Sequence, residues 1–427
     1  MLPLEQNERL TRVGPGTVMG EVFRRFWLPV CQLADVVAGG APVPIRLLGE
    51  DLLAYHTPGG GYGLIDRFCA HRGADLQYAR NEPAGLRCIY HGWQYNSSGA
   101  CVDLPNVREG AELAPRMAVK AYPVRAEGGL LWTYMGPAAQ QPPFPILPWT
   151  TFGDAHWSGH FMQIENEGNF FQHIEGLCDG SHVGFLHANL DAGGGDGRFT
   201  ASATFTDRVP RWKVLENTDY GAMLGLERDS PDGRTNLRLN QFVLPFTVLV
   251  PTPPPFEVAS WQTCVPIDDE NMMFLYTFWY DKKPIQQFVD ELNWHGKWFT
   301  PPELIPGTYK PVLNRFNRYG QDRGEYMQKQ SFSGIRNVRL QDTAASEYVR
   351  GGLIADRSAE RLVSSDRAIV QVRRRMLELA DRFEATGDLS RETKALATTR
   401  VVPLEENFAA GQDPAAIAKA KGVMAVA

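Results

Sequence analysis

Two histidines and a carboxylate stand close together near the middle of the chain. His182 and His187 are five residues apart, and Asp179 precedes the first of them by three residues. A spacing of three places Asp179 and His182 on one face of a helix, whereas a spacing of five turns two side chains roughly 140° apart. We therefore expect the helix to distort or end between the histidines, at Gly184. Two neutral imidazoles with one distant carboxylate are typical of an Fe(II) site that keeps positions open for dioxygen.

A second group of possible ligands lies earlier in the chain. Cys69-Ala-His71 and Cys88-Ile-Tyr-His91 are separated by sixteen residues. Two cysteines and two histidines can hold zinc tetrahedrally, or a [2Fe–2S] cluster with the cysteines on one iron and the histidines on the other. The mixed Cys–His pairs favour the cluster, since zinc modules usually pair Cys with Cys. Gly73 and Gly92 also favour it, because unhindered backbone amides can approach the bridging sulfides.

The elements that must position these ligands differ between the two parts of the chain. Residues 28–140 contain short runs rich in Val, Ile, Leu and Tyr separated by glycines, which predicts a small all-β domain. Residues 1–27 contain a short helix that Thr17 can cap, and we expect it to pack on the second part of the chain. Residues 141–427 mix strands with helices, and the strongest helical pattern follows Ser364. On that helix we expect Arg373 to Arg375 to form a solvated face.

Composition limits the classes of protein that this chain can be. It has 427 residues, is 43% hydrophobic and carries a net charge of −6. It can therefore bury a large core and offers no basic surface for nucleic acid. No apolar run reaches the ~20 residues that span a bilayer, and the N-terminus lacks the features of a signal peptide. We expect a cytoplasmic protein with no membrane partner, whose remaining cysteines are buried thiols: Cys31, Cys101, Cys178 and Cys264.

The two ligand groups taken together resemble the oxygenase α subunit of Rieske non-haem iron ring-hydroxylating systems. The shared pattern is Cys69-x-His71-x16-Cys88-x2-His91 followed by Asn169, Asp179-x2-His182 and x4-His187. Residues 7–17 and 334–342 resemble the phthalate dioxygenase branch of that family. The resemblance implies an α+β fold, in which an N-terminal all-β Rieske domain (residues 28–140) is joined to a catalytic domain (residues 141–427) with a large antiparallel sheet covered by helices.

The resemblance also implies the ligands of both metal centres. Cys69, His71, Cys88 and His91 would hold the Rieske [2Fe–2S] cluster. His182 and His187 would hold a mononuclear Fe(II) together with a carboxylate from far downstream. We assign that carboxylate to Asp342, with Glu347 as its rival and Asp356 as a more distant candidate that is better suited to capping a helix.

Two further residues of the second group acquire roles by resemblance. Asp179 matches an aspartate that links a histidine of the mononuclear site to a Rieske histidine of the neighbouring subunit, here His91. Asn169 matches an asparagine near the iron, although a hydrogen-bonding role in the core is an equally good interpretation. Electrons would then pass between subunits, and the family expectation is a homotrimer, or a hexamer of two stacked trimers.

The activity implied is that of the oxygenase component of a multicomponent system. A flavin and iron–sulfur reductase would supply electrons from NAD(P)H, and the protein would use O2 to cis-dihydroxylate or monooxygenate a small aromatic substrate, with an aromatic acid favoured. A Rieske-type O-demethylase of a methoxylated aromatic is the alternative. Two remoter hypotheses are a zinc hydrolase with a structural Cys2His2 site and a simple electron carrier, which would leave the second part of the chain without a role.

The sequence offers only general candidates for substrate contacts. Phe185, Phe242, Phe246 and the proline-rich stretch 251–256 could form apolar walls of a pocket. Arg208 or Arg211 could bind a substrate carboxylate in bidentate geometry, but both also fit solvated strand positions.

Overall fold

A computed structural model describes residues 2–152, 161–188, 202–252, 259–279, 301–349 and 357–420. It divides into two compact units, which we call the β unit (residues 13–144) and the mixed unit (residues 1–12 with 145–427). Residues 13–27 therefore group with the β unit, and the first boundary falls after residue 12 instead of residue 27. One reason is that Arg24 forms an ion pair with Glu50 of the β unit at 2.8 Å.

The β unit consists of three small antiparallel sheets. Their strand orders are β1-β11-β10, β2-β3-β4-β9 and β5-β6-β7-β8. The strands are β1 Trp27–Gln32, β2 Val43–Leu47, β3 Glu50–His56, β4 Tyr62–Asp66, β5 Arg80–Glu82, β6 Gly85–Arg87, β7 Gln94–Tyr95, β8 Cys101–Asp103, β9 Ala121–Tyr122, β10 Val124–Glu127 and β11 Leu130–Tyr134. Two short helices accompany them, α2 Val18–Phe23 and α3 Gly110–Leu113. Thr17 caps α2 by accepting from the Gly20 backbone, as predicted.

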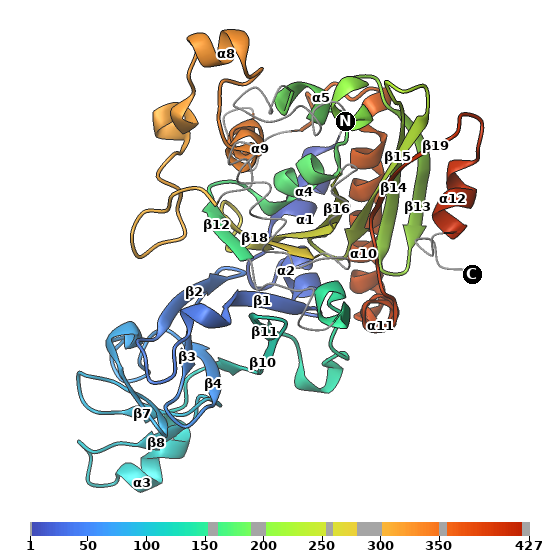
Figure 1. The fold of residues 1–427 in the computed structure, drawn as a ribbon. Helices are drawn as coiled ribbons and strands as arrows, with labels where there is room; N and C mark the ends of the chain where they lie inside the picture. Colours follow the sequence, from blue (N-terminus) through green and yellow to red (C-terminus); the bar gives the residue numbers. More distant parts are fainter. Residues whose placement is uncertain are drawn as a thin grey trace. The chain divides into compact units, whose positions relative to one another are not determined.

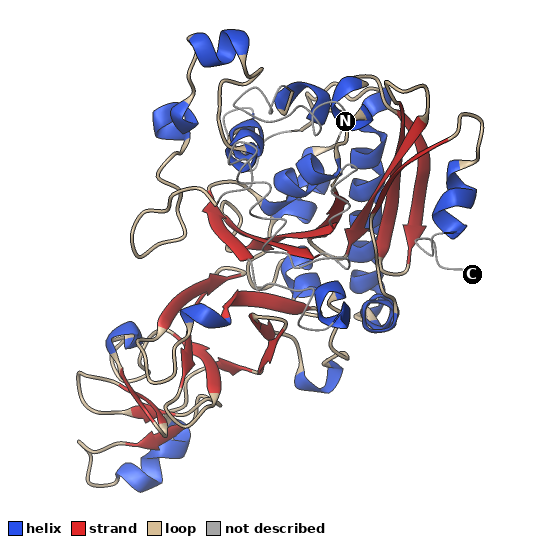
Figure 2. Cartoon of the chain, in the orientation of Figure 1, coloured by secondary structure: helices blue, strands red, loops and turns tan. Residues whose placement is uncertain are grey.

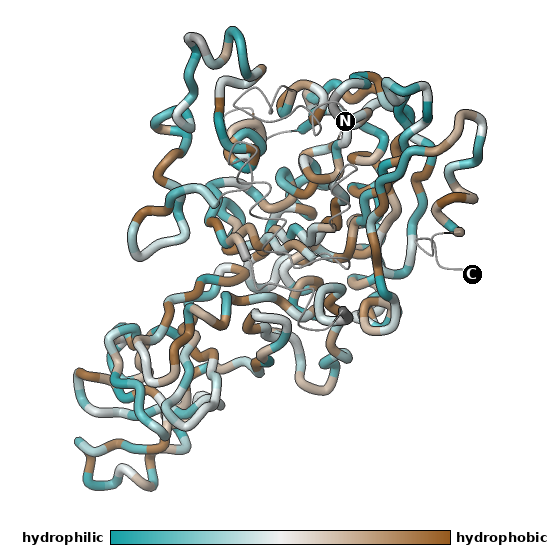
Figure 3. The backbone as a smooth tube through the Cα atoms, viewed as in Figure 1, coloured by the Kyte–Doolittle hydropathy of each residue, from teal (hydrophilic) through white to brown (hydrophobic). Residues whose placement is uncertain are grey.

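The mixed unit is built on one large antiparallel sheet (Figures 1 and 2). Its order is β12-β18-β17-β16-β15-β14-β13, and β19 pairs with β15. The strands are β12 Phe161–Asn166, β13 Arg211–Thr218, β14 Gly221–Asp229, β15 Thr235–Val243, β16 Thr247–Pro251, β17 Ala259–Pro266, β18 Met272–Trp279 and β19 Leu404–Phe408. Hydrophobic residues recur along these strands, as Figure 3 shows, because one or both faces of the sheet are covered.

Helices cover this sheet and carry the residues discussed below. Contacts join α4 to β16, β17, α9 and α10. The helices of the mixed unit are α1 Leu4–Thr11, α4 Phe170–Cys178, α5 Val183–Leu186, α6 Ala203–Thr206, α8 Glu325–Lys329, α9 Val338–Ser346, α10 Arg367–Thr386, α11 Ser390–Thr398 and α12 Pro414–Ala420. An all-β unit joined to a large helix-covered antiparallel sheet confirms the predicted fold class. None of the described helices is long and apolar enough to cross a membrane.

Candidate metal centres

The two histidines of the mixed unit flank a single helical turn. Helix α4 ends at Cys178, and α5 spans only Val183–Leu186, with His182 at its N-terminal cap and His187 at its C-terminal cap. The expected break at Gly184 is wrong, because α5 runs through that residue. The helix nevertheless ends between the histidines, as expected, but at Leu186, so the histidines leave the two ends of one turn, and their ring centroids are 5.2 Å apart.

Asp342 joins both histidines from α9. Its Oδ1 atom lies 2.9 Å from Nε2 of His187 and 3.6 Å from Nε2 of His182. Among the described residues, this is the only set of three potential ligands whose ligand atoms all lie within 4.8 Å of one another. Two imidazole nitrogens and one carboxylate at these distances fit one metal ion with further positions open.

The second ring nitrogen of each histidine, Nδ1, also has a partner. Nδ1 of His187 lies 2.6 Å from Oε1 of Gln341, whose amide nitrogen donates to the Ile335 carbonyl at 2.6 Å. Since the Gln341 amide is oriented by that carbonyl, its oxygen faces His187 and accepts the Nδ1 proton, which leaves Nε2 free to bind metal. Nδ1 of His182 lies 3.5 Å from Oδ2 of Asp179. Gln341 was not predicted from the sequence.

Both carboxylates of this site stay ionised. Burial raises the pKa of Asp342, but the neighbouring His187 and His182 outweigh burial and lower that pKa to about 2. Burial likewise raises the pKa of Asp179, whereas hydrogen bonds from His182 and Ser181 lower it to about 2. Ser181 donates to Oδ1 of Asp179 through both its backbone nitrogen and its hydroxyl, each at 2.7 Å. A charged carboxylate therefore faces His182 from either side.

Asn169 does not belong to this site. It is fully buried, caps α4 by accepting from the Phe171 backbone at 3.0 Å, and donates to the carbonyls of Thr11 and Asp269 at 2.9 and 2.7 Å. These three hydrogen bonds hold the start of α4 in place. Asn169 does not line the cavity described below. These contacts give Asn169 the hydrogen-bonding role in the core and not a role near the iron.

Glu347, the rival third ligand, is engaged elsewhere. Its carboxylate accepts from the Glu167 backbone at 3.0 Å and from the hydroxyl of Tyr319. These bonds tie the C-terminal end of α9 to the end of β12, and burial raises the pKa of Glu347. The contacts therefore favour Asp342 over Glu347 as the ligand. Asp356 lies outside the described residues.

A cavity of about 330 Å³ opens onto His182, His187 and Asp342. Its other lining residues come mainly from α4, α9 and the sheet, and include Gln172, His173, Glu175, Asp179, Arg238, Asn240, Val250, Pro251, Thr252, Ser260, Gln262, Tyr276, Arg339 and Arg357. The chain thus provides a recessed space beside the three ligands, with both polar and apolar walls. Such a cavity suits a small organic substrate.

Most of the predicted substrate contacts do not line this cavity. Phe242 and Phe246 are buried in the core, and Phe185 is partly exposed beneath the guanidinium of Arg208. Arg211 pairs on the surface with Glu227 and Asp229, so the solvated interpretation holds for it. Of the proline-rich stretch, Pro251 and Thr252 line the cavity, and residues 253–258 lie outside the described part of the chain.

Buried charges hold α4 against the C-terminal helix α10. Glu175 lies one turn before Asp179 and accepts from Arg373 and Arg357, both at 2.7 Å. Arg373 also pairs with Glu360 at 2.7 Å. We expected Arg373 to Arg375 to form a solvated face, but Arg373 and Arg375 are only 5% and 6% exposed. The carboxylates of Glu175 and Glu360 thus compensate the guanidinium groups of Arg357 and Arg373. A single charge without such a partner would be costly to bury.

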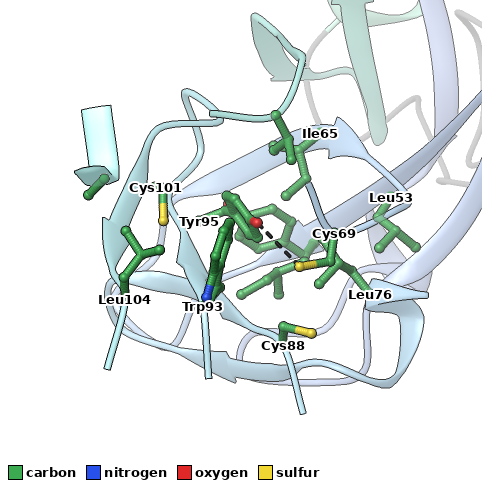
Figure 4. Close-up of a cluster of buried hydrophobic side chains, with 13 residues drawn as sticks. Leu53, Ile65, Cys69, Leu76, Cys88, Trp93, Tyr95, Cys101 and Leu104 are labelled. Atoms are coloured by element: carbon green, nitrogen blue, oxygen red, sulfur yellow. Dashed lines mark hydrogen bonds between the residues drawn. The ribbon is translucent and has the colours of Figure 1, made fainter. Parts of the chain in front are cut away.

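In the β unit, the four predicted cluster ligands gather at two neighbouring turns. Nδ1 of His71 lies 3.1 Å from Nδ1 of His91, and the sulfurs of Cys69 and Cys88 belong to the buried core (Figure 4). The turns close through backbone bonds from Gly73 to Cys69 and from Gly92 to Cys88. Both glycines have positive φ, 70° and 78°, a conformation that side-chain-bearing residues rarely adopt.

The surroundings of these ligands suit a cluster better than a single zinc ion. Trp93 stacks on His71 with ring centroids 4.5 Å apart, and the hydroxyl of Tyr95 lies 3.2 Å from the Cys69 sulfur (Figure 4). No three of the four ligand atoms fall within 4.8 Å of one another in the described residues, whereas the ligands of one tetrahedral zinc ion would. The wider spread fits two irons. The other cysteines are buried and free, as expected.

Comparisons with known proteins agree with a cluster site in the β unit and a metal site in the mixed unit. Residues 26–123 match the Rieske [2Fe-2S] domain family, and residues 133–405 match the family described as LigXa C-terminal domain like. The chain is 35% identical to the phthalate 4,5-dioxygenase oxygenase subunit of Pseudomonas putida, over 90% of this chain and 88% of that protein. It is 32% identical to the 3-chlorobenzoate-3,4-dioxygenase oxygenase subunit of Comamonas testosteroni, over 90% of each chain.

The chain therefore belongs to the Rieske non-haem iron oxygenases. Within that family it is an oxygenase α subunit related to phthalate dioxygenase, and its cofactors are a Rieske [2Fe–2S] cluster and a mononuclear iron that receives electrons through a reductase. The 5,5'-dehydrodivanillate O-demethylase oxygenase subunit of a Sphingobium species is 33% identical over 95% of this chain and 86% of that protein. Among solved structures, dicamba monooxygenase shares the fold, with a TM-score of 0.59, 17% identity and coverage of 85% and 98%. Membership in this family leaves the hydrolase and electron-carrier hypotheses without support.

Proposed function

We propose that this oxygenase hydroxylates a small aromatic acid in the cavity beside His182, His187 and Asp342, which hold the mononuclear iron. The observation that carries the assignment is the convergence of both Nε2 atoms on one ionised carboxylate at 2.9 and 3.6 Å. Cys69 and Cys88 would hold one iron of the Rieske cluster, and His71 and His91 would hold the other.

When bound, the cluster supplies single electrons and the mononuclear iron supplies the site where O2 is activated. The chain's own residues prepare that chemistry. Gln341 holds the proton of His187 on Nδ1, and Asp179 does the same for His182, so that both Nε2 atoms face Asp342.

Support for an aromatic acid comes from the names of the relatives. Phthalate, 3-chlorobenzoate and phenoxybenzoate are the substrates named for three of them. Oxidative O-demethylation is the second candidate, because a relative that matches 95% of this chain is named an O-demethylase. Both reactions begin with oxygen insertion next to the same ligands, and the bond that is attacked in the substrate distinguishes them.

We further propose a ring of three subunits, or two stacked rings, in which Asp179 of one subunit faces the cluster of the next. The position of Asp179 supports this, because Oδ2 contacts His182 and its side chain is still 20% exposed. A flavin and iron–sulfur reductase would supply electrons from NAD(P)H, which supports a cytoplasmic location.

The test is turnover of a panel of aromatic acids and methoxyarenes by the purified protein with a reductase. Product that depends on both O2 and reductant, together with about three irons per chain and acid-labile sulfide, is the expected result. Zinc in stoichiometric amount without sulfide would contradict the assignment. Formaldehyde release from a methoxyarene would select demethylation over ring hydroxylation.

A further inference from the structure

One wall of the cavity is a polar face of the large sheet. Arg238 and Asn240 alternate along β15, Ser260 and Gln262 alternate along β17, and Tyr276 lies opposite Gln262 on β18. Because successive strand side chains point to opposite faces, these five residues lie on one face, and we call them the polar wall. Its hydrogen-bonding groups must be matched by polar groups of the molecule that fills the cavity.

The orientation of Gln262 follows from its neighbours. The hydroxyl of Ser260 donates to the Val250 carbonyl at 2.9 Å, and Nε2 of Gln262 lies 3.2 Å from the same hydroxyl oxygen. A hydroxyl has one proton and a carbonyl only accepts, so Ser260 must accept from Gln262. The amide nitrogen of Gln262 therefore faces Ser260, and its Oε1 is left without a partner among the described residues.

Asn240 is fixed by the same reasoning. Its Nδ2 donates to the Leu177 carbonyl at 3.3 Å, which only an amide nitrogen can do. Its Oδ1 is buried without a partner in the described part of the chain, and the residue is 5% exposed. The polar wall thus presents two amide oxygens, and both are acceptors.

The cation of the wall is paired within the protein, although its Nε is buried without a hydrogen-bond partner among the described residues. Nη1 of Arg238 donates to Glu405 at 2.6 Å, and the Glu405 side chain is completely buried. An anionic substrate group would meet an ion pair here instead of a free positive charge. The wall is therefore better suited to a hydrogen-bond donor than to a carboxylate.

We propose that the polar wall binds a phenolic hydroxyl of the aromatic substrate, which donates to Oε1 of Gln262, with Oδ1 of Asn240 as the second acceptor. This inference rests on the proposed function, from which it takes the aromatic class of the substrate. The inference narrows the class of substrates from aromatic acids to aromatic acids that carry a ring hydroxyl. A site with oriented acceptors discriminates strongly against an analogue that lacks the donor, because the acceptors are then left unpaired.

The test measures binding of three probes to the iron-loaded holoenzyme by calorimetry without oxygen. The probes are 4-hydroxy-3-methoxybenzoate, 3,4-dimethoxybenzoate, which replaces the hydroxyl by a methoxy group, and 3-methoxybenzoate, which lacks that oxygen. The phenol should bind at least about tenfold more tightly than both others. Gln262→Met should abolish the preference, and Gln262→Glu should keep it, because a carboxylate is still an acceptor.

The matched control is Gln163→Met. Gln163 is a buried glutamine on β12 of the same sheet whose amide also has no partner among the described residues, but it does not line the cavity, so its variant should keep the preference. Equal affinities in the unchanged protein, a preference that survives in Gln262→Met, or no binding of any probe would each overturn the inference. Failure of the proposed function is separate, since it would appear as absence of O2-dependent turnover on the whole panel.

Discussion

Tyr95 offers a direct way to test how the β unit sets the electron affinity of its cluster. Its hydroxyl lies 3.2 Å from the Cys69 sulfur and its ring is fully buried. A cysteine that binds iron is a thiolate and can only accept, so the hydroxyl donates. Reduction adds negative charge to the cluster, and a donor to its sulfur therefore stabilises the reduced form more than the oxidised form.

Replacing Tyr95 by Phe should consequently lower the reduction potential. Hydrogen bonds to charged groups contribute roughly 1.5–3 kcal/mol. If about 1 kcal/mol of that differs between the two redox states, the potential falls on the order of 40 mV, because a tenfold change corresponds to about 59 mV for one electron. The assay is a redox titration of the purified protein followed by the visible and EPR spectra of the cluster.

Tyr55 provides the control for this measurement. It belongs to the same buried core, it is also fully buried, and its hydroxyl has no partner in the described part of the chain. Tyr55→Phe should therefore leave the potential unchanged. An unchanged or raised potential in Tyr95→Phe, or an equal drop in both variants, would refute the assigned hydrogen bond as its cause.

Three further predictions concern the mononuclear site. Metal analysis of Asp342→Ala should show loss of that iron, while the Rieske spectrum stays, because the cluster lies in the other unit. Glu347→Ala should still bind iron. The opposite pattern would make Glu347 the ligand. Asp179→Asn should keep both metals but slow single-turnover reoxidation of the cluster severely, and an unchanged rate would rule out its coupling role. Co-assembly of His71→Ala with His182→Ala should restore roughly one quarter of wild-type turnover if electrons cross between subunits, while tagged mixed rings without turnover would contradict that route.

The proposed histidine and cysteine ligands can be inferred from the sequence because their chemistry is local. Each Cys–His pair and the His182–His187 pair lie within a few residues, so residue type and spacing suffice. The residues that orient them could not be found in this way. Gln341 meets His187 across 154 positions, and Arg373 meets Glu175 across 198, so only the packing of α9 and α10 on α4 reveals these contacts.

The predictions for Asn169 and Arg373 failed because each residue has a second physical role. Asn169 stands at a position where asparagine is a preferred helix cap, and the structure uses it as one. Arg373 was assigned to solvent because charge is usually exposed, but the carboxylates of Glu175, which is buried, and Glu360, which is partly buried, compensate it. The proposed substrate contacts of the polar wall were missed for a different reason: they come from alternate positions on separate strands, whose pairing has no local signal.

The ion pairs of Glu175 also order the events by which this protein matures. A ribosome synthesises α4, both histidines and Asp342 before Arg357 and Arg373, the partners that compensate Glu175. Until those residues arrive, α4 carries a carboxylate that is costly to bury, and the helix cannot settle against the sheet. We therefore expect stable iron binding only once the C-terminal helix has docked. A chain truncated before residue 373 would retain every ligand and still fail to hold the metal.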